Sequence, residues 1–185
     1  MSYNSKTLCW LRYTCGIALC IGGIWATWYS ARVVYAQMEY QRIRYRDQDM
    51  PLEDVHQEAL TQYAIYPHNY HLSQWIAEKA FYDYGNTDIA AHWTNIGLEQ
   101  NPYRRNLRWL EVVLVGMENP EESARLWESY SDTVFWNRWV MAGRVYWLAL
   151  AGRVEEAEHY MEMLRRSHGN HAWAEEALEI ARTTQ

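Results

Sequence analysis

Two pairs of histidines have a spacing that could serve metal binding. His68 and His71 lie three residues apart, and His168 and His171 repeat that spacing. Imidazoles this close in sequence can share one ion. Both pairs fall where turns between helices are expected, however, and neither a cysteine nor a carboxylate completes a ligand set. We therefore interpret them as polar residues of interhelical turns and expect no metal site.

Adjacent glutamates are the second arrangement that could do chemistry. Glu121–Glu122 and Glu155–Glu156 offer the two carboxylates that glycoside hydrolysis needs. Each pair also opens a segment with helical periodicity, where acidic side chains stabilise the positive end of the helix dipole. The pattern favours helix starts over a glycosidase site.

Other catalytic signatures are missing from the sequence. It contains no G-x-S-x-G nucleophile elbow, no P-loop and no G-x-G-x-x-G fingerprint. The three cysteines, Cys9, Cys15 and Cys20, lie in or beside the first apolar segment. The rest of the chain therefore offers no thiol nucleophile, disulfide framework or cysteine-based zinc site. We expect a protein without catalytic residues or a cofactor.

Charge and aromatic content point to a membrane or a complex. Residues 1–50 carry six basic and three acidic side chains, whereas residues 51–185 carry 11 and 20, for a total net charge of −6. The acidic body argues against nucleic-acid binding, and the basic stretch could contact anionic lipid headgroups. The chain has 11 Trp and 15 Tyr against 2 Phe, residues that favour membrane interfaces and protein contacts.

The segment 13–31 has the character of a membrane span. It contains no charged residue and is bracketed by Arg12 and Arg32. As a helix rising about 1.5 Å per residue, it nearly crosses a hydrocarbon core of about 30 Å. Aromatic residues at its two ends resemble interfacial belts: Trp10 and Tyr13, then Trp25, Trp28 and Tyr29. We predict a tail at 1–12, a transmembrane helix at 13–36 and a basic juxtamembrane segment at 37–51.

Two other interpretations of this segment remain open. A cleaved signal peptide is disfavoured because no small-x-small site closes the segment, where Trp28 and Tyr29 are bulky. A buried core helix is disfavoured by the charge-free run. Small residues recur every four positions, at Ala18, Gly22, Ala26 and Ser30. This stripe either lets another transmembrane helix approach closely or arises by chance.

The body contains an internal repeat. Turn residues at Gly85, Asn119 and Gly152, and small residues at Ala90, Ala124 and Ala157, each step by 34 and then 33 positions. The tetratricopeptide repeat has a period of 34, and GLEQNP at 97–102 is similar to the segment that closes such repeats. Residues 52–185 therefore resemble a tetratricopeptide-like domain. Glu78 departs from the pattern, because a small residue is usual there; the alternative is a register shifted by one residue, which places the adjoining Ala77 at that position.

The resemblance implies an all-α fold. We expect one N-terminal transmembrane helix, followed by a short α-solenoid of about three helical hairpins and a capping helix. The hairpins are expected to stack, because a single hairpin cannot bury its apolar stripes alone. The expected elements are a long helix at 8–46, a break at 47–51, a helix at 52–66, hairpins at 69–100, 103–131 and 134–167, and a cap at 171–182.

The resemblance also implies a binding groove on the first helices of the hairpins. The family's groove positions correspond here to Trp75, Lys79, Tyr82, Asn106, Trp109, Val113, Trp139 and Tyr146. Trp and Tyr often dominate protein interfaces. The alternative is that these rings fill the core, which we expect of about half of them.

A looser resemblance covers the same stretch. The exported C-terminal region of bacterial O-antigen polymerase and oligosaccharyltransferase-type proteins also follows a spanning helix, has a run ending in Tyr-Pro like Ile65–Pro67, and carries turns like Gly152–Ala157. Those enzymes need many spanning helices for their chemistry, so no catalytic residue carries over to this chain.

The sequence favours a non-catalytic scaffold or accessory subunit of a membrane complex, held in the bilayer and binding a protein partner. The alternative is an accessory protein of envelope glycan assembly. The looser resemblance implies a bacterial inner membrane with the body in the periplasm. The count of basic residues favours a cytoplasmic body instead, with Lys6 and Arg12 before the span against Arg32, Arg42, Arg44 and Arg46 after it.

Overall fold

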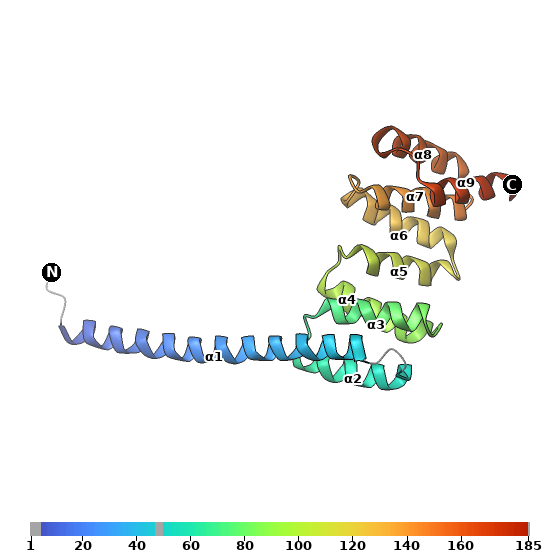
Figure 1. The fold of residues 1–185 in the computed structure, drawn as a ribbon. Coiled ribbons are helices and arrows are strands. Elements are labelled where there is room, and N and C mark those ends of the chain that lie inside the picture. Colours follow the sequence, from blue (N-terminus) through green and yellow to red (C-terminus); the bar gives the residue numbers. More distant parts are fainter. Residues whose placement is uncertain (1–4, 47–49, 185) are drawn as a thin grey trace. The chain divides into compact units, whose positions relative to one another are not determined.

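The computed structural model describes residues 5–46 and 50–184, and every regular element in these ranges is a helix (Figure 1). The helices are α1 (Ser5–Arg46), α2 (Leu52–Ile65), α3 (Tyr70–Tyr82), α4 (Thr87–Gln100), α5 (Arg105–Gly116), α6 (Pro120–Thr133), α7 (Arg138–Leu150), α8 (Val154–His168) and α9 (Ala172–Thr184). The all-α prediction is confirmed. Residues 1–4 of the expected tail and 47–49 of the expected break lie outside the described residues.

The helices group into two compact units, Met1–His68 and Asn69–Gln185. In the first unit α1 packs against α2. Tyr40 of α1 and Val55 of α2 are among its buried residues. The Arg32 guanidinium donates a 2.7 Å hydrogen bond to the Ile65 carbonyl, and Arg42 forms ion pairs with Glu39 and Glu58. The structure thus joins α2, which the repeat pattern groups with the later helices, to α1.

Helix α1 is long and apolar enough to cross a membrane over Tyr13–Tyr45, and no other helix in the described ranges meets that criterion. Its apolar side chains within residues 13–31 are exposed, including Leu19 at 77% and Ile24 at 72%. The small-residue stripe Ala18, Gly22, Ala26 and Ser30 is also exposed along α1.

The second unit consists of helices that pack on their neighbours in chain order, from α3 to α9, with a repeat-like appearance (Figure 1). The chain reverses at the three predicted turns. Gly85 and Gly152 adopt left-handed φ values of 64° and 75°, which glycine reaches without steric cost. Asn119 caps α6 instead, since its side-chain oxygen accepts a hydrogen bond from the Glu122 amide at 3.1 Å.

The turn before α7 is longer than predicted. The sequence predicts the third hairpin to begin at 134, but α7 begins at Arg138 because the Asn137 side chain caps it. Phe135 and Trp136 therefore lie in the turn, where both are 63% exposed.

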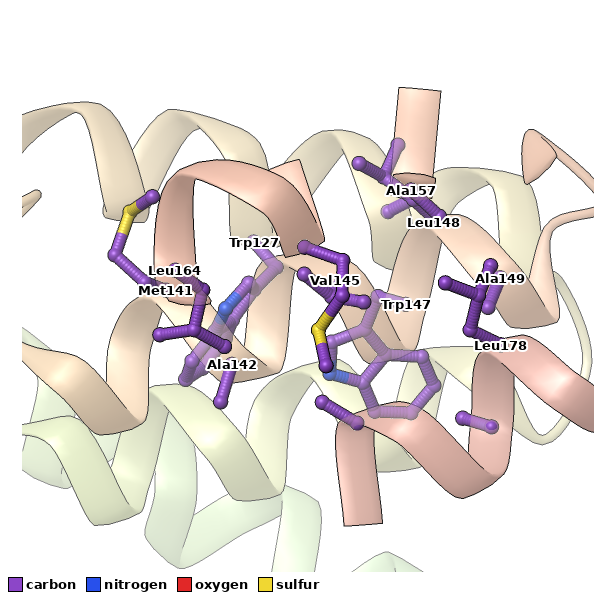
Figure 2. Close-up of a cluster of buried hydrophobic side chains, with 14 of the residues drawn as sticks. Trp127, Met141, Ala142, Val145, Trp147, Leu148, Ala149, Ala157, Leu164 and Leu178 are labelled. Carbon is purple, nitrogen blue, oxygen red and sulfur yellow. The ribbon is translucent and has the colours of Figure 1, made fainter. Parts of the chain in front are cut away.

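Small residues allow the helices of the second unit to approach closely. The repeated alanines Ala90, Ala124 and Ala157 are completely buried. At Gly143, a Cβ would lie 2.6 Å from the Trp127 ring. Figure 2 shows the resulting core of α6 to α9, in which Trp127, Val145, Leu164 and Leu178 belong to four different helices. The terminal helix α9 is thus part of this core.

Candidate functional site

The second unit contains a cavity of about 600 Å³ with aromatic walls. Helices α3, α5 and α7, the first helices of successive hairpins, supply most of its lining, and α6 and α9 supply the rest. The lining residues are Glu78, Tyr82, Arg105, Asn106, Trp109, Trp127, Trp139, Tyr146 and Trp173. A concave, largely apolar site with few polar groups is the usual form of a binding pocket.

The cavity brings together five of the eight groove residues expected from the sequence, namely Tyr82, Asn106, Trp109, Trp139 and Tyr146. Trp75, Lys79 and Val113 are not in its lining. Lys79 pairs with Asp83 at 3.5 Å and lies 5.9 Å from the centroid of the Trp75 ring. Val113 packs against the core of the second unit.

None of the eight groove residues is fully buried, although we expected about half of their rings to fill the core. The buried tryptophans are Trp93, Trp127 and Trp147, of which Trp147 keeps 5% exposure. Trp109 and Tyr146 pack against the buried cluster and also line the cavity. The same side chain can therefore belong both to the core and to the cavity wall, and the repeat spacing in the sequence does not distinguish the two.

Trp109 lies at the centre of the aromatic wall. Its ring centroid is 5.4 Å from that of Trp127, 5.6 Å from Trp147, and 5.8 Å from both Tyr146 and Trp173. Edge-to-face and tilted contacts at these distances are the favoured geometries for aromatic pairs. The wall is therefore held by mutual packing of rings from α5, α6, α7 and α9.

Trp139 and Trp173 form a second part of the wall. Their rings are nearly parallel, at 17°, with centroids 6.5 Å apart. His171 stands almost perpendicular to both, 4.7 Å from Trp139 and 4.8 Å from Trp173. The pKa of His171 is lowered by burial first and by the Arg138 charge second, against a smaller opposite effect of Glu175. Its neutral imidazole thus packs as an aromatic ring.

Neither histidine pair belongs to a group of three or more His, Cys, Asp or Glu side chains that could hold an ion within the described ranges. His168 is exposed, whereas His171 is buried. The Nδ1 atom of His171 has no hydrogen-bond partner among the residues that the structure describes.

A positioned carboxylate provides the polar side of the cavity. The Glu78 Oε1 atom accepts hydrogen bonds from the Gln74 amide at 2.8 Å and from the Asn106 amide at 3.1 Å. Burial first, and the Glu78 charge second, raise the pKa of the neighbouring Tyr82, whereas a hydrogen bond with Trp109 acts in the opposite direction. Tyr82 thus remains a neutral phenol at physiological pH.

The sequence-based site lacked four lining residues: Glu78, Arg105, Trp127 and Trp173. Glu78 had a signal, because it is the departure from the small residue usual at its repeat position. Trp173 belongs to the terminal helix, which repeat spacing does not cover, so the sequence carries no comparable signal for it.

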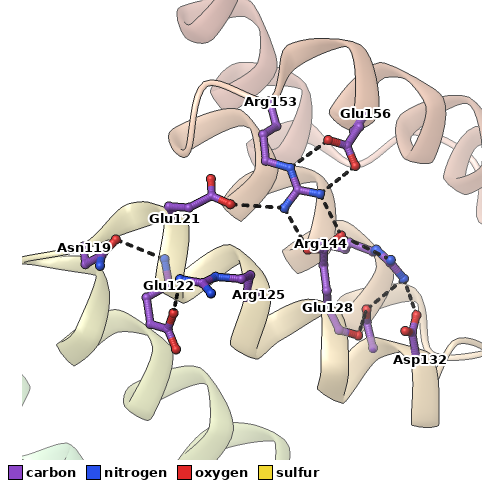
Figure 3. A network of polar contacts seen from close by, with 10 residues as sticks. Asn119, Glu121, Glu122, Arg125, Glu128, Asp132, Arg144, Arg153 and Glu156 are labelled. Carbon is purple, nitrogen blue, oxygen red and sulfur yellow. Dashed lines mark hydrogen bonds and ion pairs between the residues drawn. The ribbon is translucent and has the colours of Figure 1, made fainter.

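The paired glutamates have a structural role. Both pairs lie in first helical turns, of α6 and α8, as predicted. Arg153 connects them in the network of Figure 3, where it contacts Glu121 at 3.7 Å and Glu156 at 2.6 Å. It also binds Glu128 at 2.8 Å. These ion pairs connect α6 and α8, the second helices of successive hairpins.

Comparisons of the chain with protein-family models, curated proteins and solved structures gave no match.

Proposed function

We propose that this protein is a membrane-anchored, non-catalytic scaffold or accessory subunit that holds a protein partner. In this proposal residues 13–36 cross the bilayer, and helices α3 to α9 form a tetratricopeptide-like solenoid. The observation that carries the proposal is the aromatic cavity, because its lining comes mainly from the first helices of three successive hairpins.

The properties of α1 support the anchor. Its charge-free run 13–31 exposes large apolar side chains along the helix, a surface that is favourable in a bilayer and costly in water. Arg32 lies at the end of this run, where it binds the Ile65 carbonyl and stacks over the Trp28 ring at 4.7 Å. A charged residue with these contacts is suited to the interface rather than the hydrocarbon core.

The cavity supports a role in binding. Trp and Tyr side chains in a well-packed pocket are the residues that dominate protein association, at about 2 kcal/mol or more each. Trp139 lines the cavity and is still 53% exposed, so a partner could cover it without unfolding the domain.

The test is recovery of partners from native membranes with the full-length tagged protein. We expect Trp139→Ala to abolish co-purification of the partner while the melting temperature changes little. Trp136→Ala is the matched control, because Trp136 is 63% exposed three residues away and does not line the cavity. Unchanged partner recovery from folded Trp139→Ala and Tyr82→Ala variants would exclude the cavity as the partner site.

An accessory role in envelope glycan assembly is the second candidate. The cavity combines aromatic faces with a carboxylate, an amide and a guanidinium, from Glu78, Asn106 and Arg105. Such groups can hydrogen-bond sugar hydroxyls. Loss of either charged residue, Glu78 or Arg105, should weaken the binding of a sugar. A charged ligand should instead respond to the two losses with opposite signs.

A further inference from the structure

We propose that the aromatic cavity accepts a basic side chain of the partner, a lysine ammonium or an arginine guanidinium. This inference rests on the proposed function, since it names the chemistry by which the partner is held. Six of the nine lining residues are Trp or Tyr. The faces of these rings carry negative charge density and attract cations, with Trp the strongest.

The Glu78 carboxylate supplies a full negative charge in the same cavity. Its Oε1 atom accepts hydrogen bonds from Gln74 and Asn106, which are neutral and form no ion pair with it. The nearby Arg104 guanidinium is engaged by the Gln74 Oε1 atom at 2.6 Å. Its Oε2 atom has no hydrogen-bond or ion-pair partner among the described residues. Glu128 and Glu156 of the same unit, in contrast, are both paired with Arg153.

This combination is suited to a cation. A half-buried carboxylate beside aromatic walls loses part of its hydration, and an incoming ammonium or guanidinium would restore favourable electrostatics. The ring faces stabilise the same charge. Residues 69–185 also carry 17 acidic and 11 basic side chains, so the field of the whole unit favours the approach of a positive group.

Arg105 opposes the bound cation and makes the inference testable. It is the one basic residue in the lining of the cavity, is exposed, and begins α5. Its guanidinium forms no hydrogen bond or ion pair with any residue that the structure describes. Glu78 and Arg105 therefore act on a charged ligand with opposite signs.

The binding experiment uses the full chain in detergent micelles, labelled with 5-fluorotryptophan and observed by ¹⁹F NMR. Trp→Phe variants assign the resonances. The probes are acetyl-Gly-Arg-Gly-amide and its citrulline analogue, which has nearly the same shape without the charge, and the matching lysine and acetyl-lysine peptides. We expect the charged peptides to shift the resonances of Trp109, Trp139 and Trp173. The neutral analogues should bind about tenfold more weakly.

Charge variants identify the sign of the ligand. Glu78→Gln keeps the Oε1 acceptor for Gln74 and Asn106, and we expect it to weaken binding of the charged peptides about tenfold. Arg105→Gln should strengthen binding several-fold. Glu176→Gln is the matched control, because it removes the same charge from an exposed position of α9 outside the cavity. It should change the affinity by less than about twofold.

Several results would overturn the inference. Weakening by both cavity substitutions would indicate a neutral polar ligand such as a sugar, and the reverse signs would indicate an anion. Equal binding of the arginine and citrulline peptides, or no shift with any peptide, would exclude a cation site even if a variant failed to fold. A cation site combined with unchanged partner recovery from Trp139→Ala would contradict the proposed function alone. Partner loss without peptide binding would contradict only the ligand class.

Discussion

The repeated positions of this protein differ in what their side chains contact. Ala90, Ala124 and Ala157 follow the repeat and are completely buried. Glu78 stands next to the completely buried Ala77, where the pattern has a small residue, and lines the cavity with its Oε1 atom hydrogen-bonded to Gln74 and Asn106. A charged residue at a position that usually packs costs stability unless it is hydrogen-bonded, and here two amides satisfy one of its oxygens. The unusual residue type at position 78 is therefore the feature of the repeat pattern that pointed to the cavity.

His171 gives the folded state a dependence on pH. It is 5% exposed, and burial together with the Arg138 charge lowers its pKa in the folded state. The resulting stability is complete above the unfolded value of about 6.5 and is lost as the pH falls through the lower folded pKa. We expect the melting temperature of the wild type to fall between pH 8 and pH 5.5 more steeply than that of His171→Phe.

His159→Phe serves as the control, because it removes a histidine that is exposed on α8. Equal slopes for the wild type and His171→Phe would show that His171 does not titrate differently in the folded and unfolded states.

The close packing of α6 and α7 depends on a glycine at their contact. Gly143 of α7 faces Trp127 of α6, whose indole nitrogen donates a 2.9 Å hydrogen bond to the Val140 carbonyl. The ring therefore cannot move without losing that bond. Gly143→Ala should destabilise the domain by about 1–3 kcal/mol through overpacking, although alanine is the better helix former. Thermal melting measures the change, with Gly23→Ala as control, where a Cβ meets no atom within 4 Å.

The ion pairs of α6, α7 and α8 differ in burial, and their contributions should differ accordingly. Glu128 contacts Arg144 at 3.4 Å and Arg153 at 2.8 Å, and the side chain of Arg144 is only 10% exposed. Glu128→Gln should cost about 1–3 kcal/mol, because two arginines lose a charged partner. Glu162→Gln removes an exposed pair with Arg166 and should cost well under about 1 kcal/mol. Equal losses in urea unfolding would contradict this difference.

The helices could be predicted from the sequence because their ends carry local signals. Gly85, Asn119 and Gly152 stop or start helices by their own backbone and side-chain preferences. The cavity could be predicted only in part, since ring contacts depend on how helices pack in three dimensions. Trp109 and Tyr146 follow from repeat spacing, whereas Trp173 enters from α9 through tertiary packing alone.

At the scale of the whole molecule, the two units offer different surfaces to their surroundings. The first exposes large apolar side chains along the charge-free part of α1. The second has a net acidic surface and places most of its exposed aromatic area at turns and at the cavity, as with Trp136 and Trp139. The proposed scaffold needs both an anchor and a binding surface, and the surfaces of the two units are suited to these two roles.

The anchor makes the last prediction. If residues 13–36 cross the bilayer, the full-length protein should stay in the membrane pellet after alkaline carbonate, and its mature N-terminus should precede the span. Leu19→Arg combined with Ile24→Arg places two charges where the exposed helix would meet hydrocarbon, at about 2.5–3.5 kcal/mol each on insertion scales. This variant should shift to the soluble or degraded fraction.

Met38→Arg is the control, because it makes the same change at an exposed position of α1 that lies beyond the charge-free run. Headgroups and water can solvate the charge there, so the pellet fraction of this variant should match that of the wild type. Release of the wild-type protein by carbonate, or a mature chain that begins after Trp28, would show that α1 does not hold the protein in the membrane.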